Sequence, residues 1–216
     1  MGDVRAADVR RDLVIESIEL RTGALRFVRP RDAAALLDVE DVVIDEAYPP
    51  FWAKLWPSGV ELAHQLSMHD WSGTSVVELG CGLGLPAVAA ALAGGTVLAT
   101  DRSRDALAFT AANAGANDAA VETALCSWEA PESLVARGPW QLVLASDVLY
   151  ERRNSDELIA LLPRLVTDDG AVWIADPGRA MVPEFLEVTR ASWRTVEVDR
   201  TSREDVQIIR LAGPPR

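Results

Sequence analysis

The sequence predicts an α/β fold, with a doubly wound, mostly parallel sheet of seven strands and an N-terminal β-hairpin. From Ser75 onward, apolar strand-like runs alternate with helical runs, which is typical of parallel strands joined by helices. A glycine-rich turn at residues 80–84 joins the first of these strands to a helix. The chain has 216 residues, 49% hydrophobic and 25% charged. This composition suits one globular, Rossmann-like core.

The first 60 residues are expected to form an extension that packs on the main domain, residues 61–216. Thr22-Gly23 separates two partly alternating runs and predicts the turn of a hairpin. Pro30 ends the second strand, since proline cannot donate to a strand ladder. The segments expected here are a polar tail over residues 1–12, strands over residues 13–20 and 25–28, a short helix over residues 32–37, and a stretch of uncertain structure over residues 38–48.

An aromatic and proline-rich segment follows at residues 48–59. Its three prolines and four aromatic residues make it rigid and apolar. A helix is expected next, over residues 58–66, with Ser58 as its N-cap. The segment is either the packed core of a loop or a wall beside a ligand, because aromatic faces suit a cation such as a sulfonium. On the second interpretation, Trp56 contacts a cofactor.

The remaining elements alternate along the chain. Strands are expected at residues 75–79, 96–100, 120–125, 141–146, 171–175, 194–198 and 206–211. Helices are expected at residues 86–93, 102–114, 156–165 and 182–191. Asp168-Asp169-Gly170 is a turn signal. Ligands of such sheets bind at the carboxyl ends of the strands, so the residues that follow each strand are the candidates for a site.

The glycine turn distinguishes between cofactors. It reads Glu78-Leu79-Gly80-Cys81-Gly82-Leu83-Gly84, and Leu85 stands where a dinucleotide fingerprint has its last glycine or alanine. The spacing is instead similar to the first motif of class I methyltransferases, which use S-adenosylmethionine (SAM). Glycines let the backbone turn sharply near a ligand, and the next helix offers unpaired N–H groups. Glu78, Gly80, Gly82 and Gly84 are therefore cofactor candidates. The alternative is an ordinary strand-to-helix turn.

Two further strand ends carry cofactor candidates. Asp101 follows the second strand, where nucleotide-binding α/β folds place the acid that accepts from ribose hydroxyls. It could instead cap the next helix. Trp128 follows the third strand and could pack on an adenine ring or lie on the surface. Cys126, two residues earlier, is expected to be a packing residue, because no base stands near it in the sequence.

The fourth strand ends at Ser146, and Asp147-x-x-Tyr150 comes directly after it. This motif resembles the one that marks the seven-β-strand lysine methyltransferases, and residues 50–59 are similar to the stretch before their glycine motif. Asp176-Pro177-Gly178-Arg179 and residues 25–30 are similar to the branch that methylates the β-subunit of electron transfer flavoprotein. The resemblance covers roughly residues 13–211.

The resemblance implies a SAM-dependent N-methyltransferase that acts on a lysine side chain of a protein and yields S-adenosylhomocysteine. Residues 61–216 would be its SAM-binding domain. Asp147 would orient the acceptor amine, Tyr150 would supply a wall or a hydrogen bond, and Ser146 would lie beside the cofactor. The structural alternatives are a helix cap for Asp147 and a core position for Tyr150. A small-molecule N- or O-methyltransferase and a non-catalytic SAM-binding partner protein stay open as functions.

Composition and charge argue against several classes of protein. A net charge of -12 repels phosphate backbones, so the expected partner is a protein with an exposed lysine or a small amine, not nucleic acid. The two cysteines and two histidines form no metal-ligand pattern. No run approaches the roughly 18 apolar residues of a membrane span. A cytoplasmic monomer is expected; the acceptor and the number of methyl groups transferred are not defined by the sequence.

Overall fold

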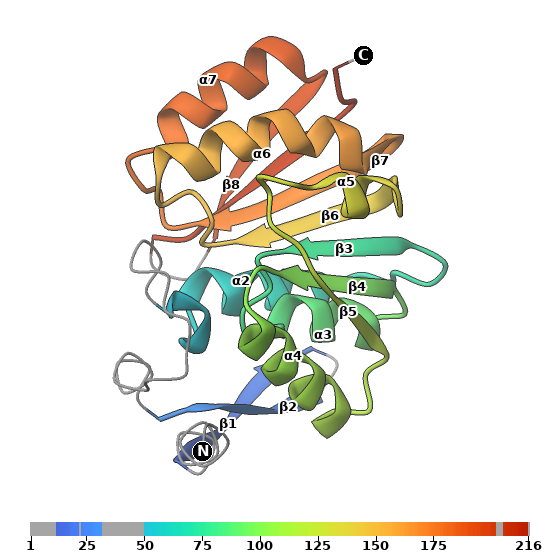
Figure 1. Ribbon diagram of the computed structural model, residues 1–216, viewed down its shortest axis with the longest axis vertical. Coiled ribbons are helices and arrows are strands. Elements are labelled where there is room, and N and C mark those ends of the chain that lie inside the picture. The colour runs from blue at the N-terminus through green and yellow to red at the C-terminus, as the bar shows by residue number, and fades with distance from the viewer. Residues whose placement is uncertain (1–11, 22, 32–49, 202–204, 216) are drawn as a thin grey trace.

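The computed structural model describes residues 12–21, 23–31, 50–201 and 205–215. Its main feature is a seven-stranded sheet in the order β5-β4-β3-β6-β7-β9-β8 (Figure 1). The five strands from β5 to β7 run parallel, and β9 pairs antiparallel with both β7 and β8. The predicted doubly wound, mostly parallel sheet is confirmed. Its strands are β3 (Ser75–Leu79), β4 (Thr96–Asp101), β5 (Val121–Leu125), β6 (Trp140–Ser146), β7 (Val166–Asp176), β8 (Thr195–Arg200) and β9 (Gln207–Ala212).

Helices cover both faces of this sheet. Neighbouring residues of one strand enter different cores: Val76 packs with α2, α3 and α4, whereas Val77 packs with α6 and α7. This alternation follows from the two-residue period of a strand, and it explains why the central strands are apolar throughout. The helices are α2 (Pro57–Leu66), α3 (Leu85–Leu92), α4 (Arg104–Ala116), α5 (Glu132–Val135), α6 (Arg152–Leu165) and α7 (Val182–Ser192).

The strand order reverses at β3, which lies between β4 and β6. Chain connections leave β3 and β6 toward opposite faces of the sheet, because α3 belongs to one core and α6 to the other. Such a switch point opens a crevice at the carboxyl ends of the two strands, where ligands of open α/β sheets bind. The glycine turn follows β3 and the Asp147 motif follows β6, so the fold brings these two sequence motifs to one place.

The predicted hairpin is present, with β1 (Leu13–Leu20) antiparallel to β2 (Gly23–Pro30). Its inner face buries Phe27 in the same core as α2, α3 and α4. Two side-chain amides, from Asn113 in α4 and from Asn117 at its C-cap, bind the outer edge of β2. Asn113 accepts from the N–H of Val28 at 2.7 Å and donates to its carbonyl at 3.1 Å. Asn117 repeats the pattern at Arg26, with distances of 2.9 and 2.8 Å.

Two local predictions are wrong. Ser58 does not cap α2: the helix begins at Pro57, and the N-cap position is Trp56, without a side-chain bond. Proline suits a first turn because the missing N–H would be unpaired there. Asp168-Asp169-Gly170 does not end a strand but lies within β7, where the pairing jumps from Val166 to Ala171 while the neighbouring strand advances by two residues. The turn signal thus marks a bulge.

Some predictions lie outside the described residues, namely the polar tail over residues 1–12, of which only Asp12 is described, the short helix over residues 32–37 and the stretch over residues 38–48. The division of the chain at residue 60 stays a prediction. A short 3-10 turn, η2 (Phe51–Ala53), and helix α5 were not predicted. Among the described residues, no helix has the length and apolar character needed to cross a bilayer.

Candidate active site

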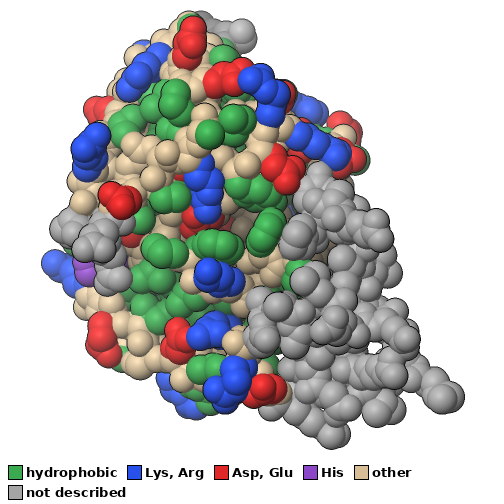
Figure 2. Space-filling model, turned by 90° about the vertical axis from the view of Figure 1, so that its left-hand side faces the viewer, with side chains coloured by type: hydrophobic (Ala, Val, Ile, Leu, Met, Phe, Trp, Pro, Cys, Tyr) green, Lys and Arg blue, Asp and Glu red, His purple; other side chains and the backbone are tan. Residues whose placement is uncertain are grey.

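A cavity of about 730 Å³ opens at the switch point. This volume is within the usual range for small-molecule and cofactor sites. Figure 2 shows apolar side chains and several cationic ones around a hollow on one face of the molecule. Nine of the ten site residues predicted from the sequence line the cavity: Trp56, Gly80, Gly82, Gly84, Asp101, Trp128, Ser146, Asp147 and Tyr150. The tenth, Glu78, is fully buried and is not among the residues that line the cavity.

The glycine turn has positive φ at all three of its glycines, 65° at Gly80, 55° at Gly82 and 81° at Gly84. Side chains at these positions would also meet protein atoms. A Cβ at Gly84 would lie 2.5 Å from the side chain of Thr110, and one at Gly82 would lie 3.2 Å from the carbonyl oxygen of Trp52. The turn is therefore shaped as much by close packing with α4 and the aromatic segment as by access for a ligand.

Glu78 is a buried carboxylate just before the turn. Its Oε2 accepts from the N–H of Ala87 in the first turn of α3 at 2.9 Å, whereas Oε1 has no hydrogen-bond partner among the described residues. Burial raises the pKa of Glu78 to about 8, opposed by the Ala87 N–H and supported by the nearby Asp101 carboxylate. A buried oxygen without a partner suits a ligand that brings a donor, such as the ammonium end of SAM.

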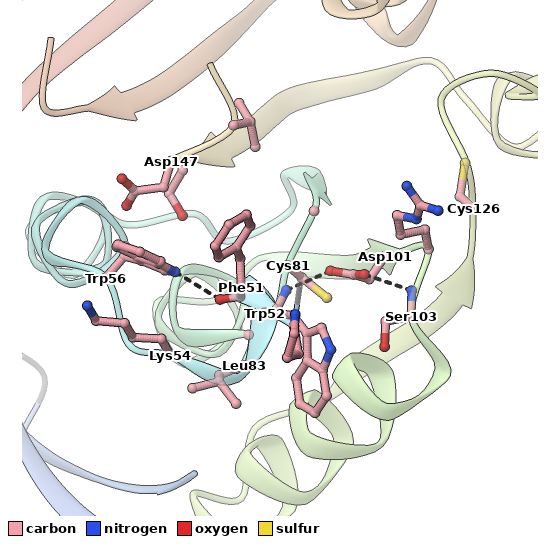
Figure 3. Close-up of a pocket in the computed structure, with 18 of the residues that line it drawn as sticks. Phe51, Trp52, Lys54, Trp56, Cys81, Leu83, Asp101, Ser103, Cys126 and Asp147 are labelled. Atoms are coloured by element: carbon pink, nitrogen blue, oxygen red, sulfur yellow. Dashed lines mark hydrogen bonds between the residues drawn. The ribbon is translucent and has the colours of Figure 1, made fainter. Parts of the chain in front are cut away.

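Asp101 holds together two backbone segments that line the cavity. Its Oδ2 accepts from the N–H of Gly82 at 2.9 Å, and its Oδ1 accepts from the N–H of Ser103 at 2.8 Å, as Figure 3 shows. The helix-cap alternative for Asp101 is wrong, because α4 begins at Arg104 and its cap is Ser103, whose hydroxyl accepts from Ala106. Burial raises the pKa of Asp101, and the N–H bonds oppose this effect.

Aromatic rings line the remaining side of the cavity. The Phe51 ring stands edge-on to both Tyr150 and Trp56, with centroid distances of 5.7 and 6.3 Å. Trp56 donates to the carbonyl of Phe51 at 2.9 Å, and the Lys54 ammonium lies 4.4 Å from the centre of its ring (Figure 3). The Trp128 ring lies against Gly80, where a Cβ would be 3.4 Å away. The aromatic segment is thus a cavity wall, as the second sequence interpretation predicted.

Asp147 lies at the end of β6 with a φ of 58°, a left-handed conformation in which Asp is more frequent than most residues. Its side chain is only 8% exposed, and its Oδ1 lies 2.6 Å from Nη1 of Arg179. The same Nη1 lies 3.0 Å from Oδ2 of the buried Asp176. Burial raises the pKa of Asp147, and the Arg179 guanidinium opposes this. This group of three charges was not predicted from the sequence.

The structural alternatives for the Asp147 motif are wrong. Helix α6 has Glu151 as its N-cap, so Asp147 does not cap it. Tyr150 is 39% exposed and is not a core residue. Both side chains line the cavity that the glycine turn also borders. Asp147 and Tyr150 are therefore placed where a second molecule could approach a bound cofactor.

Arg179 was not predicted as a site residue, although its position in the sequence indicated that it could be one. Asp176-Pro177-Gly178-Arg179 directly follows β7, and strand ends are where such a sheet gathers its functional groups. Among the described residues there is no cluster of side chains that could hold a metal ion. Cys81 and Cys126 are both free thiols, and burial raises the pKa of Cys81 well above its ordinary value. A protonated, buried thiol is a poor nucleophile.

A seven-stranded sheet with antiparallel β9, a glycine turn after β3 and an acid at the end of β4 define the class I SAM-dependent methyltransferases. The solved structure of a T. thermophilus 16S rRNA N2 G1207 methyltransferase (RsmC) matches 94% of this chain and 51% of its own, with a TM-score of 0.67 and 14% identity. That likeness shows the fold. The chain belongs to the lysine methyltransferase family, whose family model matches residues 45–186. It is a methyltransferase with SAM as its cofactor.

Two relatives agree with this family. Protein N-lysine methyltransferase METTL21A of Danio rerio is 32% identical over 166 residues, which are 73% of this chain and 76% of that protein. The electron transfer flavoprotein beta subunit lysine methyltransferase of Xenopus laevis is 35% identical over 137 residues, 61% of this chain and 54% of that protein. The chain thus spans about half the length of the second relative. The resemblance noted from the sequence, including its branch, is supported.

Proposed function

We propose that this enzyme transfers a methyl group from SAM to the ε-amine of a lysine side chain on a protein. The observation that carries the proposal is the carboxylate of Asp147, which borders the cavity beside the aromatic rings of Phe51 and Tyr150. An anionic group next to aromatic faces favours a cationic acceptor. An alcohol or phenol acceptor would gain no such attraction. The relatives named as lysine methyltransferases support the same choice.

The remaining site residues fit a bound SAM molecule. We assign the ribose hydroxyls to Asp101, the adenine ring to Trp128, and the amino-acid end to Glu78 and the glycine turn. Trp56 and Ser146 would lie beside the cofactor on the side of the Asp147 motif. When bound, SAM supplies a methyl group that is already activated by a sulfonium. The protein then has mainly to hold the acceptor in line and exclude water.

The acceptor must lose a proton before it reacts, because a free lysine titrates near 10.4. We propose that Asp147 attracts the ammonium form and orients the neutral amine by accepting its remaining N–H. Tyr150, whose ring is edge-on to Phe51, would form one side of the space that holds the lysine side chain. Water can take the proton, so a strong general base is not needed.

Labelled SAM tests the proposal. The purified enzyme is incubated with tritiated SAM and a lysate, the protein and small-molecule fractions are separated, and the labelled residue is identified by mass spectrometry. We expect label on lysine in the protein fraction. The matched control is Asp147→Asn, which should bind SAM and label the protein fraction much more slowly. Label confined to the small-molecule fraction would assign the enzyme to small amines or alcohols instead.

The assembly and compartment are also proposals. We propose a monomer that works in the cytoplasm without a nucleic-acid partner. The net charge of -12 supports the absence of nucleic acid, and two unpaired cysteines suit a reducing compartment. Light scattering after size exclusion would give the mass in solution, and a mass of twice 23.4 kDa would contradict the monomer.

A further inference from the structure

We propose that Arg179 is a positioning residue for methyl transfer: it keeps Asp147 ionised and fixed at the cavity, and it thereby sets the pH range in which the acceptor amine is bound. This inference rests on the proposed function, because it gives Asp147 the acceptor amine as its partner.

The contacts of Arg179 show how it would act. Its Nη1 lies 2.6 Å from Oδ1 of Asp147 and 3.0 Å from Oδ2 of Asp176. Asp176 is fully buried, and its Oδ1 accepts from the N–H groups of Gly178 at 2.8 Å and of Arg179 at 2.9 Å. These hydrogen bonds hold the turn after β7 against Asp176. The backbone of Arg179 is therefore fixed, and its guanidinium reaches Asp147 from one side.

Arg179 acts through Asp147 and not on the acceptor. Asp147 lines the cavity, whereas Arg179 is not among the described residues that line it. The guanidinium carbon lies over the Trp56 ring, 5.9 Å from its centre. The backbone of Asp147 is held as well, since its N–H donates to the carbonyl of Ala175 at 2.9 Å. With backbone and Oδ1 both fixed, the direction of the carboxylate is set before an acceptor arrives.

The charges around Asp147 explain why the arginine is needed. Two charged groups act on this carboxylate among the described residues, Arg179 from the turn before α7 and Asp176 from the end of β7. The hydroxyl of Ser58 in α2 is a neutral neighbour of Asp147 that lowers the pKa of its carboxyl. The two groups are not hydrogen-bonded to each other. Burial and Asp176 both raise the pKa of Asp147, and Arg179 is the largest effect that lowers it.

The net charge of the group also matches its task. Two carboxylates and one guanidinium sum to one negative charge, which a single lysine ammonium neutralises. Without the arginine, two carboxylates would share a buried site, and one would take up a proton at neutral pH. Asp147 would then be a neutral acid and would lose its attraction for the acceptor. The charge of Arg179 therefore decides whether Asp147 is an ionised carboxylate that attracts the acceptor or a neutral acid that does not.

The first measurement is independent of the acceptor. The carboxyl carbon of Asp147 is titrated by ¹³C NMR in the full-length protein with S-adenosylhomocysteine added, and Asp147→Asn assigns the signal. In Arg179→Met we expect the pKa of Asp147 to rise by about one to three pH units, the usual effect of one neighbouring charge. Arg179→Lys keeps the charge and should restore most of the original value. Arg179→Gln repeats the test if the methionine variant does not fold.

The matched control is Arg152→Met. Arg152 also forms an ion pair, with Glu184 at 2.6 Å, but both side chains are exposed and neither lines the cavity. Its loss should leave the Asp147 titration and SAM affinity unchanged. An unchanged Asp147 titration in Arg179→Met and Arg179→Gln, or an equal change in Arg152→Met, would overturn the proposal.

The second measurement uses the acceptor found by labelling. In Arg179→Met the acidic limb of kcat/KM should move to higher pH by the same amount as the NMR titration, with SAM affinity within a few-fold of wild type. A higher KM with an unmoved pH profile would mean that Arg179 touches the acceptor, and would overturn the positioning role. If the wild-type enzyme labels no lysine, the proposed function fails, while the NMR result still decides whether Arg179 controls Asp147.

Discussion

Glu78→Gln is predicted to change how the stability of the protein depends on pH. The Glu78 carboxylate is fully buried, and one of its oxygens has no partner among the described residues. Burial raises its pKa from 4.5 to about 8. Each pH unit between these values corresponds to about 1.4 kcal/mol, so ionised Glu78 costs on the order of 5 kcal/mol of folding free energy. Glutamine can still accept from the N–H of Ala87, but it does not titrate.

The direction of the effect follows from proton linkage. Because the pKa of Glu78 is higher in the folded state, the folded protein keeps a proton that the unfolded chain has lost. The stabilising contribution is complete below about pH 4.5, falls as the pH rises, and is lost above about pH 8. Wild type should therefore lose stability relative to Glu78→Gln across this range.

Urea unfolding at pH 5.5, 6.5 and 7.5, without SAM, measures this difference. Subtracting wild type from Glu78→Gln cancels the other titrating groups, and the remainder should grow by about 1.4 kcal/mol per pH unit. A remainder that stays constant over this range would refute the reasoning, because Glu78 would then be ionised in the folded protein throughout. With saturating SAM the dependence should shrink, since the ammonium of the cofactor would favour the charged carboxylate.

Three further predictions concern the cavity. Asp101→Ala should weaken SAM binding roughly ten- to a hundredfold, or about 1.5–3 kcal/mol; equal calorimetric affinities would exclude the ribose assignment. Gly84→Ala should destabilise the protein by about 1–3 kcal/mol more than Gly73→Ala, because both have positive φ but only the first places a Cβ against Thr110; equal urea midpoints would contradict this. Asp147→Asn should lower turnover at least tenfold with SAM affinity within a few-fold, and wild-type turnover would remove Asp147 from the acceptor site.

Sequence reasoning worked where the signal is local. The apolar run before Glu78 and the glycine spacing after it define β3, the turn and α3 without any knowledge of distant residues. The position of Asp147 after β6 follows in the same way, since parallel strands bring their carboxyl ends together. These local signals explain why the fold could be predicted correctly. The aromatic segment lies at the cavity because it directly precedes α2.

Tertiary contacts set the limits of that reasoning. The pairing of Asp147 with Arg179 joins the ends of two strands, and only the folded sheet brings the residues together. Ser58 failed as a cap because Pro57 starts the helix one residue earlier. Gly84 lines the cavity, and its close contact with Thr110 on α4 could not be predicted from the sequence. The contacts of Asp147 and Gly84 are long-range, whereas the start of α2 is decided by the neighbouring Pro57.

The amides of α4 protect the hairpin from unwanted association. A two-stranded ribbon has exposed edges, and an open edge is a template for another strand, the first step of aggregation. Asn113 in α4 and Asn117 at its C-cap are four residues apart, a helical rise of about 6 Å, close to the roughly 6.8 Å between alternate residues of a strand. The helix therefore imitates a neighbouring strand at Val28 and Arg26. It occupies the donors and acceptors through which a second chain would otherwise attach to this edge.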